Sequence, residues 1–506
     1  MSGRIDEQND HGARESSLEI DRDAAEELGR EFLALAVEQL TNIRDLPIFP
    51  ATDASALKLE FDPVMPLEGV DPQKLLVECQ SIIKGSRQNG HPRFFGYVAS
   101  PATFPGICAD FLASALNQNV TSWRSSPSAT EIERIVIKWL GELTGFGSDC
   151  AGILTSGGSM ANLNALTMAH RAKCEADVSR EGIRNSGRTM TIFATDQTHH
   201  SVLKAADLIG LGRNQVRIVD TDDRFRMDVR ALRQQIEADK AGGFHPFCVV
   251  ATAGTVNTGA VDPLAAIAEI AREHRMWLHV DGAYGGPAAA DKSKQMLFDG
   301  IGIADSMSID AHKWLYSPVD CGCLLFRDAR DARQAFSESS EADYIKVYEQ
   351  QQDEAFAFWD YGMELSRRFR ALKLWMMMKY FGVRRIAESI AEDCRLASYM
   401  AERVQASDDF ELLAPVELSI CCFRYLPRQI RESALASGEK TTTTLRLNNL
   451  NAAIMHSIQR GGRGYLSNAN LRGQFALRAC IVNFRTKRSD IDYTLDLVRE
   501  TAAGLT

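Results

Sequence analysis

The sequence lacks the features that mark membrane and secreted proteins. No apolar run approaches the roughly 18 residues that a membrane-spanning helix needs, and the N-terminus is polar and acidic rather than leader-like. The 11 cysteines are an odd number and are scattered without a paired framework, which is typical of a reducing compartment. We therefore expect a cytoplasmic protein with no membrane partner.

The sequence also lacks the signatures of nucleic-acid, nucleotide and metal binding. The net charge is −10 and no lysine- or arginine-rich run stands out, which argues against a nucleic-acid partner. No GxxxxGK[ST] stretch is present, so ATP chemistry has no support. The pairs Cys321/Cys323 and Cys421/Cys422 are too close together for a zinc ribbon, and we expect no metal. No internal repeat or low-complexity segment appears in the 506 residues.

What the sequence does contain centres on Lys313. This lysine lies between two apolar runs, Ser306–Ile309 and Cys321–Phe326, which predict strands. Bulky aromatic neighbours should partly desolvate its amine, and desolvation favours the neutral form. A neutral amine is a nucleophile for aldehydes, so Lys313 is a candidate Schiff-base lysine. The alternative is a surface lysine whose stem lies on Trp314.

A carboxylate upstream strengthens the first interpretation. Asp281 ends a predicted buried strand, Trp277–Val280, in the stretch HVDGAYGG. Ligands of open α/β sheets bind at the carboxyl ends of strands. A carboxylate there can keep a pyridine nitrogen protonated, as pyridoxal phosphate (PLP) requires. The alternative is that Asp281 only caps a turn.

A glycine turn supplies a possible phosphate site. Residues 152–170 predict a strand, a turn and a helix, and the N–H groups of Gly157, Gly158 and Ser159 would form an anion site at the helix N-terminus. Ser159 could equally be an N-cap with no ligand. His199, after the predicted strand Thr191–Ala194, is a candidate to hold a cofactor ring, although a surface turn is the alternative.

At this point the sequence resembles a known family. Asp281 with Ala283, and Asp310 with His312 and Lys313, are similar to the signature of the group II PLP-dependent amino-acid decarboxylases. These include the aromatic-L-amino-acid, glutamate and cysteine-sulfinate decarboxylases. The resemblance runs from about residue 18 to the C-terminus. It implies PLP as cofactor, an amino acid as small-molecule substrate, and a carboxy-lyase that releases CO₂ and an amine.

The resemblance also implies roles for individual residues. Catalysis is expected from Lys313, His199, Tyr344 and Asp281. The residues expected to bind the cofactor are Gly157, Gly158, Ser159, His199, Thr255, Asp281, Ala283, Asp310, His312 and Lys313. Those expected to meet the substrate are Tyr97, Ser100, His199, Ser366 and Arg478.

Three of these assignments carry open questions. Asp310 would repel a phosphate, so it could act through water or a backbone amide. Arg478 could be structural instead of meeting the substrate carboxylate. Tyr344 lies in a polar segment long enough to be a mobile loop, where the family has a tyrosine thought to protonate Cα and to reach into the partner's site. Related aldehyde synthases have phenylalanine there.

The order of strands and helices predicts the fold. Short strands such as Val216–Val219 and Cys248–Ala251 alternate with helices such as Leu264–Glu273, which is a βαβ rhythm. With the resemblance, this predicts an α/β, type I PLP-dependent transferase fold with a mostly parallel seven-stranded sheet. We expect a disordered tail (1–17), an N-terminal helical segment (18–95), a large PLP-binding domain (96–385) and a small α+β domain (386–506).

The N-terminal segment predicts assembly. Apolar residues recur at helical spacing between residues 18 and 43 with no nearby partner in the sequence: Leu28, Phe32, Leu35, Ala36, Leu40 and Ile43. In the resembling family this segment packs against the other subunit. We therefore expect a homodimer with composite active sites.

The substrate is the finest prediction. Acidic-substrate relatives carry an FFNQ-type stretch where this chain has FFGYVAS (94–100), and tend to have glutamine in place of Asp320. Ser366 matches a serine of plant decarboxylases that act on phenolic substrates. Asn119 and Thr121 are polar where apolar pocket residues are usual, and unpaired polar groups would reject a wholly apolar ring. We expect tyrosine or dihydroxyphenylalanine to be preferred over tryptophan, phenylalanine and glutamate.

The same residues are compatible with other functions. The chain could decarboxylate an acidic amino acid (glutamate, aspartate or cysteine sulfinate) or be an aromatic aldehyde synthase. A lysine-bound PLP would also suit an aminotransferase or a carbon–carbon lyase. From a different class, the chain could be a catalytically inactive PLP-fold regulatory protein.

Overall fold

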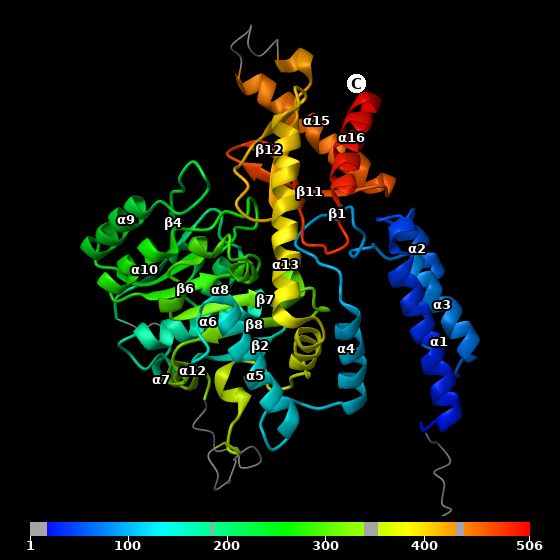
Figure 1. Ribbon diagram of the computed structural model, residues 1–506. Helices are drawn as coiled ribbons and strands as arrows, with labels where there is room; N and C mark the ends of the chain where they lie inside the picture. Colours follow the sequence, from blue (N-terminus) through cyan, green and yellow to red (C-terminus); the bar gives the residue numbers. More distant parts are fainter. Residues whose placement is uncertain (1–17, 184–186, 338–352, 432–439, 506) are drawn as a thin grey trace, which may run out of the picture.

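The computed structural model describes residues 18–183, 187–337, 353–431 and 440–505 (Figure 1). The predicted N-terminal tail and Tyr344 lie outside the described residues. In the described part of the chain, no helix combines the length and apolar character needed to cross a membrane.

A seven-stranded sheet forms the centre of the larger part of the molecule. Its strands lie in the order β2-β8-β7-β6-β5-β3-β4, and all neighbouring pairs are parallel except those that β8 makes. The prediction of a mostly parallel α/β sheet is therefore confirmed. The strands are β2 (Ala151–Thr155), β3 (Met190–Thr195), β4 (Val216–Val219), β5 (His245–Thr252), β6 (Trp277–Asp281), β7 (Ser306–Asp310) and β8 (Gly322–Phe326).

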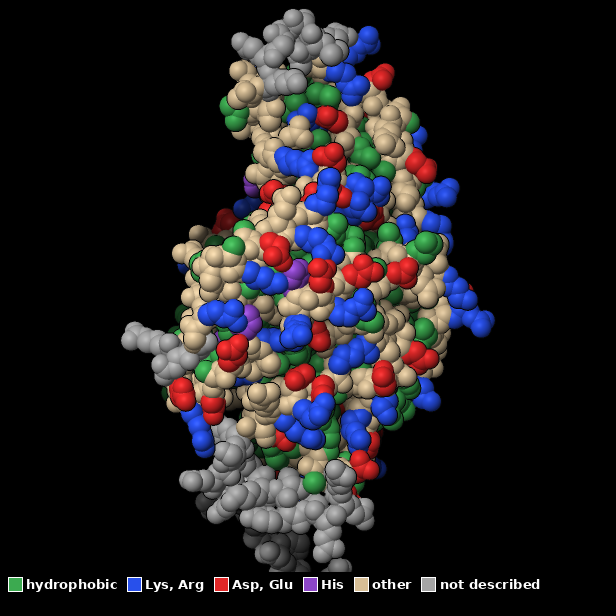
Figure 2. All heavy atoms as spheres, turned by 90° about the vertical axis from the view of Figure 1, so that its left-hand side faces the viewer, with side chains coloured by type: hydrophobic (Ala, Val, Ile, Leu, Met, Phe, Trp, Pro, Cys, Tyr) green, Lys and Arg blue, Asp and Glu red, His purple; other side chains and the backbone are tan. Residues whose placement is uncertain are grey.

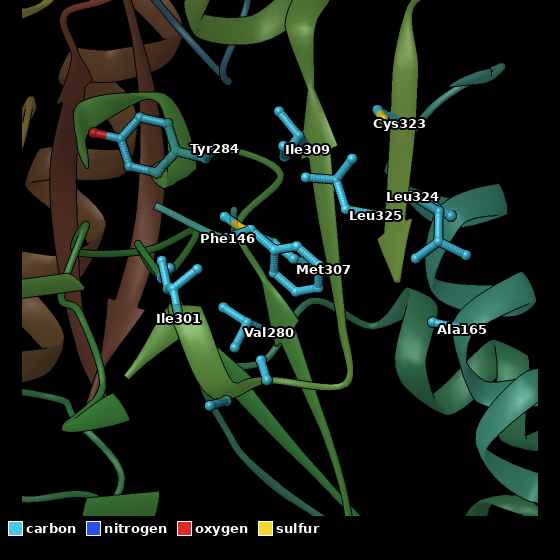
Figure 3. Packing of buried hydrophobic residues seen from close by; sticks show 14 of the residues in the cluster. Phe146, Ala165, Val280, Tyr284, Ile301, Met307, Ile309, Cys323, Leu324 and Leu325 are labelled. Carbon is cyan, nitrogen blue, oxygen red and sulfur yellow. The ribbon is translucent and has the colours of Figure 1, made fainter. Parts of the chain in front are cut away.

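The central strands are buried on both faces because helices cover both faces. Every residue of β6, β7 and β8 is buried. Figure 3 shows Val280, Met307 and Leu324 from these strands among the packed side chains. The covering and connecting helices are α4 (Phe104–Leu116), α5 (Pro127–Thr144), α6 (Gly158–Lys173), α7 (Val178–Glu181), α8 (Ser201–Leu208), α9 (Val229–Ala241), α10 (Leu264–Glu273), α11 (Ala311–Trp314) and α12 (Ala329–Phe336).

A second, five-stranded sheet lies in the C-terminal part, in the order β1-β11-β12-β10-β9. Its first strand, β1, comes from far upstream and pairs in parallel with β11. The strands are β1 (Phe94–Phe95), β9 (Phe410–Leu412), β10 (Ile420–Tyr425), β11 (Tyr465–Leu471) and β12 (Gln474–Cys480), with helices α15 (Lys440–Gly461) and α16 (Arg488–Leu505) beside them.

Helix α13 (Ala371–Gln405) connects the part built on the seven-stranded sheet with the part built on the five-stranded sheet (Figure 1). It contacts α4 and α5 near its start, and β9, β10 and α16 further along. The chain bends at Gly382, where φ is 74°, a backbone conformation that glycine adopts without steric cost. The expected division at 385/386 therefore falls inside this helix.

The N-terminal helices form a separate arm on one side of the molecule (Figure 1). They are α1 (Arg22–Thr41), α2 (Ala54–Glu60) and α3 (Pro72–Lys84). Helix α1 packs on α3 and buries no residue completely. On the opposite side of the molecule, Figure 2 shows basic and acidic side chains interspersed, without a large field of one sign.

Candidate active site

Lys313 lies in the short helix α11, directly after β7. Its Nζ is 2.9 Å from Asp310 Oδ2, three residues earlier. Burial by itself lowers the pKa of Lys313, but the carboxylates of Asp310 and Asp281 together raise the pKa above its usual value. The expectation of a neutral amine is therefore wrong, because two carboxylates outweigh the desolvation.

The aromatic neighbour of Lys313 is held in the interior by contacts of its own. Trp314 is fully buried and stacks on Tyr284, with ring centroids 5.1 Å apart and planes 8° apart. Its Nε1 donates to Asp393 Oδ2 at 2.9 Å. Trp314 therefore anchors the lysine turn to α13 and does not support the lysine stem on the surface.

Asp281 is the last residue of β6 and is buried. Asn162 Nδ2 donates to its Oδ2 at 2.8 Å, while Ser308 Oγ and the Ala283 N–H donate to its Oδ1 at 3.1 Å. Burial alone would raise the pKa of Asp281, but Lys313 and these donors lower it below its usual value. The carboxylate is thus ionised and available to a basic ring nitrogen.

The glycine turn leads directly into α6. Gly157 precedes the helix and Gly158 is its first residue. A Cβ atom at Gly158 would lie 2.8 Å from Asp310 Oδ2 and 3.1 Å from the Ala283 methyl, so only glycine leaves this cradle open. Asp310 Oδ1 is buried and has no hydrogen-bond partner among the described residues, so a ligand donor could meet it here.

His199 follows β3 and lies on the wall of the same cavity. Its ring stacks on His200, with centroids 4.7 Å apart. Desolvation lowers the pKa of His199 below its usual value, against the opposing effect of Asp281. The imidazole is therefore neutral near neutral pH and can lie against an aromatic ring.

These groups converge on one cavity of about 380 Å³. The predicted residues that line it are Gly157, Gly158, Ser159, His199, Asp281, Ala283, Asp310, His312 and Lys313. The donor set fits PLP: N–H groups of the first turn of α6 for a phosphate, Asp281 for the pyridine nitrogen, and Lys313 for the aldehyde carbon. The described residues contain no cluster of ligands that could hold a metal ion.

One predicted cofactor contact does not reach the cavity. The Thr255 hydroxyl bonds the Thr258 hydroxyl at 2.9 Å and accepts from the Ala260 N–H at 3.2 Å, inside its own turn. Thr252, the last residue of β5, does line the cavity, and its buried hydroxyl has no partner within the described chain. The structure thus puts Thr252 where the sequence suggested Thr255.

Of the expected substrate residues, His199 lines the cavity, whereas Tyr97, Ser100, Ser366 and Arg478 do not. Arg478 is buried and donates to the carbonyls of Val256 (2.8 Å) and Tyr97 (2.9 Å), which is a structural use of its guanidinium. Its Nη2 is buried without a partner in the described part of the chain. Ser100 Oγ donates to the His312 carbonyl at 3.2 Å, and Ser366 is exposed.

Two arguments about the substrate also change. Asn119 Oδ1 accepts from the Arg367 N–H at 2.8 Å, and the Thr121 hydroxyl bonds the Ser125 hydroxyl at 2.9 Å. Both side chains are thus satisfied, so the expectation that unpaired groups at these positions reject an apolar ring is wrong. Asp320 is occupied by an ion pair with Arg370 at 3.1 Å.

Sequence reasoning missed Asn162, which touches Asp281 and lines the cavity. It lies four residues after Gly158 on α6, and residues at that spacing share a helix face. This spacing was a usable signal. Tyr284, which also lines the cavity, stands inside the HVDGAYGG stretch.

Comparison with known proteins gives the same family as the geometry. The family model described as "Pyridoxal-dependent decarboxylase conserved domain" matches residues 55–426. An "Aromatic-L-amino-acid decarboxylase" from Bacillus atrophaeus is 34% identical over 94% of this chain and 95% of its own length.

More distant relatives carry different names. A "Phenylacetaldehyde synthase" from Petunia hybrida is 31% identical over 93% of this chain and 92% of its own length. The human "Acidic amino acid decarboxylase GADL1" is 31% identical over 94% of this chain and 91% of its own length. Among solved structures, that of "Oryza sativa TDC with PLP and tryptamine" superposes with a TM-score of 0.88 at 26% identity, covering 97% of this chain and 100% of the other.

Proposed function

Since the chain belongs to the pyridoxal-dependent decarboxylase family and is a PLP-dependent carboxy-lyase, we propose that it decarboxylates an aromatic amino acid with a phenolic ring. The observation that carries the reaction class is the cavity where Lys313, Asp281 and His199 meet the N-terminus of α6. An inactive regulatory protein would have no need to keep an ionised carboxylate and an amine in one buried cavity.

The residues divide the chemistry among themselves. PLP, when bound, supplies a protonated pyridine ring that accepts the electron pair released as the bond between Cα and the carboxylate breaks. Asp281 holds the proton on the pyridine nitrogen, and the N–H groups at the start of α6 bind the phosphate. Lys313 Nζ is the attachment atom. It must first lose its proton, and Asp310 Oδ2 at 2.9 Å is placed to accept it.

Charge favours an aromatic over an acidic substrate. Among the described lining residues, Lys313 is the one lysine or arginine, and the cofactor needs it. A second carboxylate on the substrate would enter without a counter-charge, which is costly in a desolvated cavity. Val256 and Tyr284 offer apolar surface to a ring. The FFGYVAS stretch and the Bacillus relative point the same way.

A panel of substrates tests this proposal. We expect kcat/KM to be highest for tyrosine or dihydroxyphenylalanine, followed by tryptophan and phenylalanine, with glutamate last. CO₂ and hydrogen peroxide are measured together, because peroxide with an aldehyde product would identify an aldehyde synthase. A preference for glutamate, aspartate or cysteine sulfinate would contradict the aromatic assignment, and no CO₂ from any substrate would contradict catalysis.

We also propose a homodimer with composite active sites. The half-buried apolar stripe of α1 and its exposed neighbours support this, as does the family role of Tyr344 in returning a proton to Cα. Mixed dimers of Lys313→Ala and Tyr344→Phe subunits should recover activity that neither parent has. No recovery after proven subunit exchange would place each tyrosine in its own subunit's site.

We propose that the protein works in the cytoplasm. All 11 cysteines are free, and 8 of them are buried, among them Cys248, Cys321 and Cys421. Such thiols need no oxidising compartment. Fractionation of cells that carry the tagged full-length chain tests this, and enrichment in a secreted or membrane fraction would contradict it.

A further inference from the structure

A chain of buried hydrogen bonds runs behind the cavity wall and links Asp281 to His199. Its central member is Asn162 on α6. Asn162 Nδ2 lies 2.8 Å from Asp281 Oδ2 and 2.9 Å from Ser201 Oγ. Ser201 Oγ in turn lies 2.8 Å from His199 Nδ1. Asn162, Ser201 and Asp281 are each less than 5% exposed.

The same chain continues away from the cavity. Asn162 Oδ1 lies 3.0 Å from His279 Nε2, and His279 Nδ1 lies 2.9 Å from Ser306 Oγ. Ser306 Oγ also receives the indole N–H of Trp277 at 2.9 Å. All of these groups are buried, so water cannot substitute for a missing partner.

Two members of this half of the chain, Asp281 and Trp277, have only one possible role, and they fix its direction. An ionised Asp281 can only accept, so Asn162 must turn its NH₂ toward Asp281 and its oxygen toward His279. His279 then donates from Nε2 and accepts at Nδ1 from Ser306, whose oxygen accepts from Trp277, a donor-only indole. Both ends of this half of the chain require the same direction.

The other half is fixed in the same way. Ser201 Oγ accepts from the Asn162 amide, so its own proton is free to point at His199 Nδ1. The Ser201 backbone N–H, which can only donate, faces the same Nδ1 at 3.3 Å. Two donors thus meet one ring nitrogen, which must carry a lone pair. The proton of a neutral His199 is then on Nε2, for which no partner occurs among the described residues.

We propose that Asn162 and Ser201 are positioning residues that hold His199 in the neutral form with its proton on Nε2. Asn162 thereby ties the group that protonates the cofactor ring to the group that covers its face. Nε2–H is left as the donor that the site can offer to an anionic substrate atom. Only this catalytic consequence rests on the proposed function; the proton position does not.

Other charged groups also act on His199. Asp281 and Asp310 favour its protonation, while Lys313 and His200 oppose it. None of the four contacts Nδ1, whereas Ser201 does so through two donors. Hydrogen bonds to the neutral form disfavour the charged form, so the loss of the Ser201 hydroxyl should let the pKa of His199 rise toward its usual value.

Histidine nitrogen NMR on the cofactor-free, full-length protein tests the proposal without any catalytic assay. Chains labelled with ¹⁵N-histidine are titrated, and the His199 signals are assigned by their loss in His199→Gln. In the wild type we expect one neutral form, protonated on Nε2. In Ser201→Ala we expect the second tautomer to appear and the protonation midpoint to move up, and in Ser201→Thr, which keeps the hydroxyl, the wild-type signals.

Matched variants separate the chain from a general disturbance of the site. Ser308→Ala removes a donor from the other oxygen of Asp281 and leaves Asn162 and Ser201 in place, so the His199 signals should stay unchanged. Asn162→Ala should change the His199 signals as Ser201→Ala does. If Asn162→Ala does not fold, the comparison of Ser201→Ala with Ser308→Ala decides the question.

The loaded enzyme gives a second readout. In Ser201→Ala we expect kcat to fall about tenfold with little change in KM. The acidic limb of the pH profile of kcat should move to higher pH. A Ser201→Ala protein whose His199 keeps the single Nε2–H form and the wild-type midpoint would overturn the proposal. A Ser308→Ala protein that shifts the His199 signals and midpoint as far as Ser201→Ala does would also overturn it.

Discussion

Helices α1 and α6 are both long, yet the folded chain treats them in opposite ways. Helix α6 has 16 residues and buries nine of them, whereas α1 has 20 residues and buries none. Helix α6 contacts the central strands β7 and β8 as well as α8 and α12, and its first turn opens onto the cavity. Helix α6 is therefore packed on several sides by its own chain.

Helix α1, in contrast, has no buried residue and packs on α3 along one side. The predicted stripe, which includes Leu28, Phe32 and Leu35, is only half-buried, on the side toward α3. Beside it, Leu33 and Val37 are 52% and 36% exposed. These exposed apolar side chains lie beside the half-buried stripe, where the proposed interface would cover them. The comparison separates a helix that its own chain packs from an arm whose apolar side chains are partly uncovered in the single chain.

The largest expected effect comes from a change in the cavity that leaves the N-terminal arm intact. Lys313→Ala removes the amine that holds the cofactor, and we expect kcat to fall by about four orders of magnitude or more. Oligomeric state and thermal stability should stay near those of the wild type. Borohydride reduction followed by peptide mapping should label Lys313 in the wild type and no lysine in the variant. Labelling at another lysine would contradict the assignment.

The next effect breaks the N-terminal arm alone. Leu33→Asp with Val37→Asp places two charges on side chains that are exposed in a single chain, so a lone subunit should tolerate them. Against a partner's apolar surface they would be buried and unpaired, which costs several kcal/mol. We expect a monomer in sedimentation experiments, with activity reduced at least about tenfold. Leu208→Asp puts the same charge on a side chain that is 74% exposed, at the end of α8 and outside the arm, so this control should stay assembled.

A smaller effect tests the start of α6. In Gly158→Ala the new methyl would meet Asp310 Oδ2 at 2.8 Å, so the turn or the carboxylate must shift. We expect PLP affinity to fall about tenfold, measured by cofactor titration, with the fold intact. Gly461→Ala, in α15 with open space around it, is the matched control. Equal affinity in both variants would mean that the turn does not hold the phosphate.

These contrasts explain what the sequence could predict. Strand ends and glycine turns impose local rules, so Asp281, Lys313 and Gly158 could be found from their neighbours in sequence. Thr252 and Thr255 lie on the same strand end, and only the fold decides which hydroxyl faces the cavity. The pKa of Lys313 depends on its distance to Asp310, and the satisfied side chain of Asn119 depends on Arg367, far away in sequence. No spacing rule contains such distances.

The smallest effect lies within the buried half, at Asp393. Its Oδ2 accepts from Trp314 Nε1 at 2.9 Å and from the Tyr316 hydroxyl at 2.7 Å, and burial raises its pKa to about 7 from 3.8. Between these two values the folded state keeps a proton that the unfolded state releases. The contribution of Asp393 to stability is therefore largest below about pH 4, and it falls by up to about 1.4 kcal/mol per pH unit until about pH 7. Asp393→Asn removes this titration, so we expect its Tm to fall less between pH 5 and pH 8 than the wild type's, at one protein concentration. An equal fall in both proteins would mean that Asp393 is ionised in the folded chain across that range, and that Trp314 and Tyr316 together offset the cost of its burial.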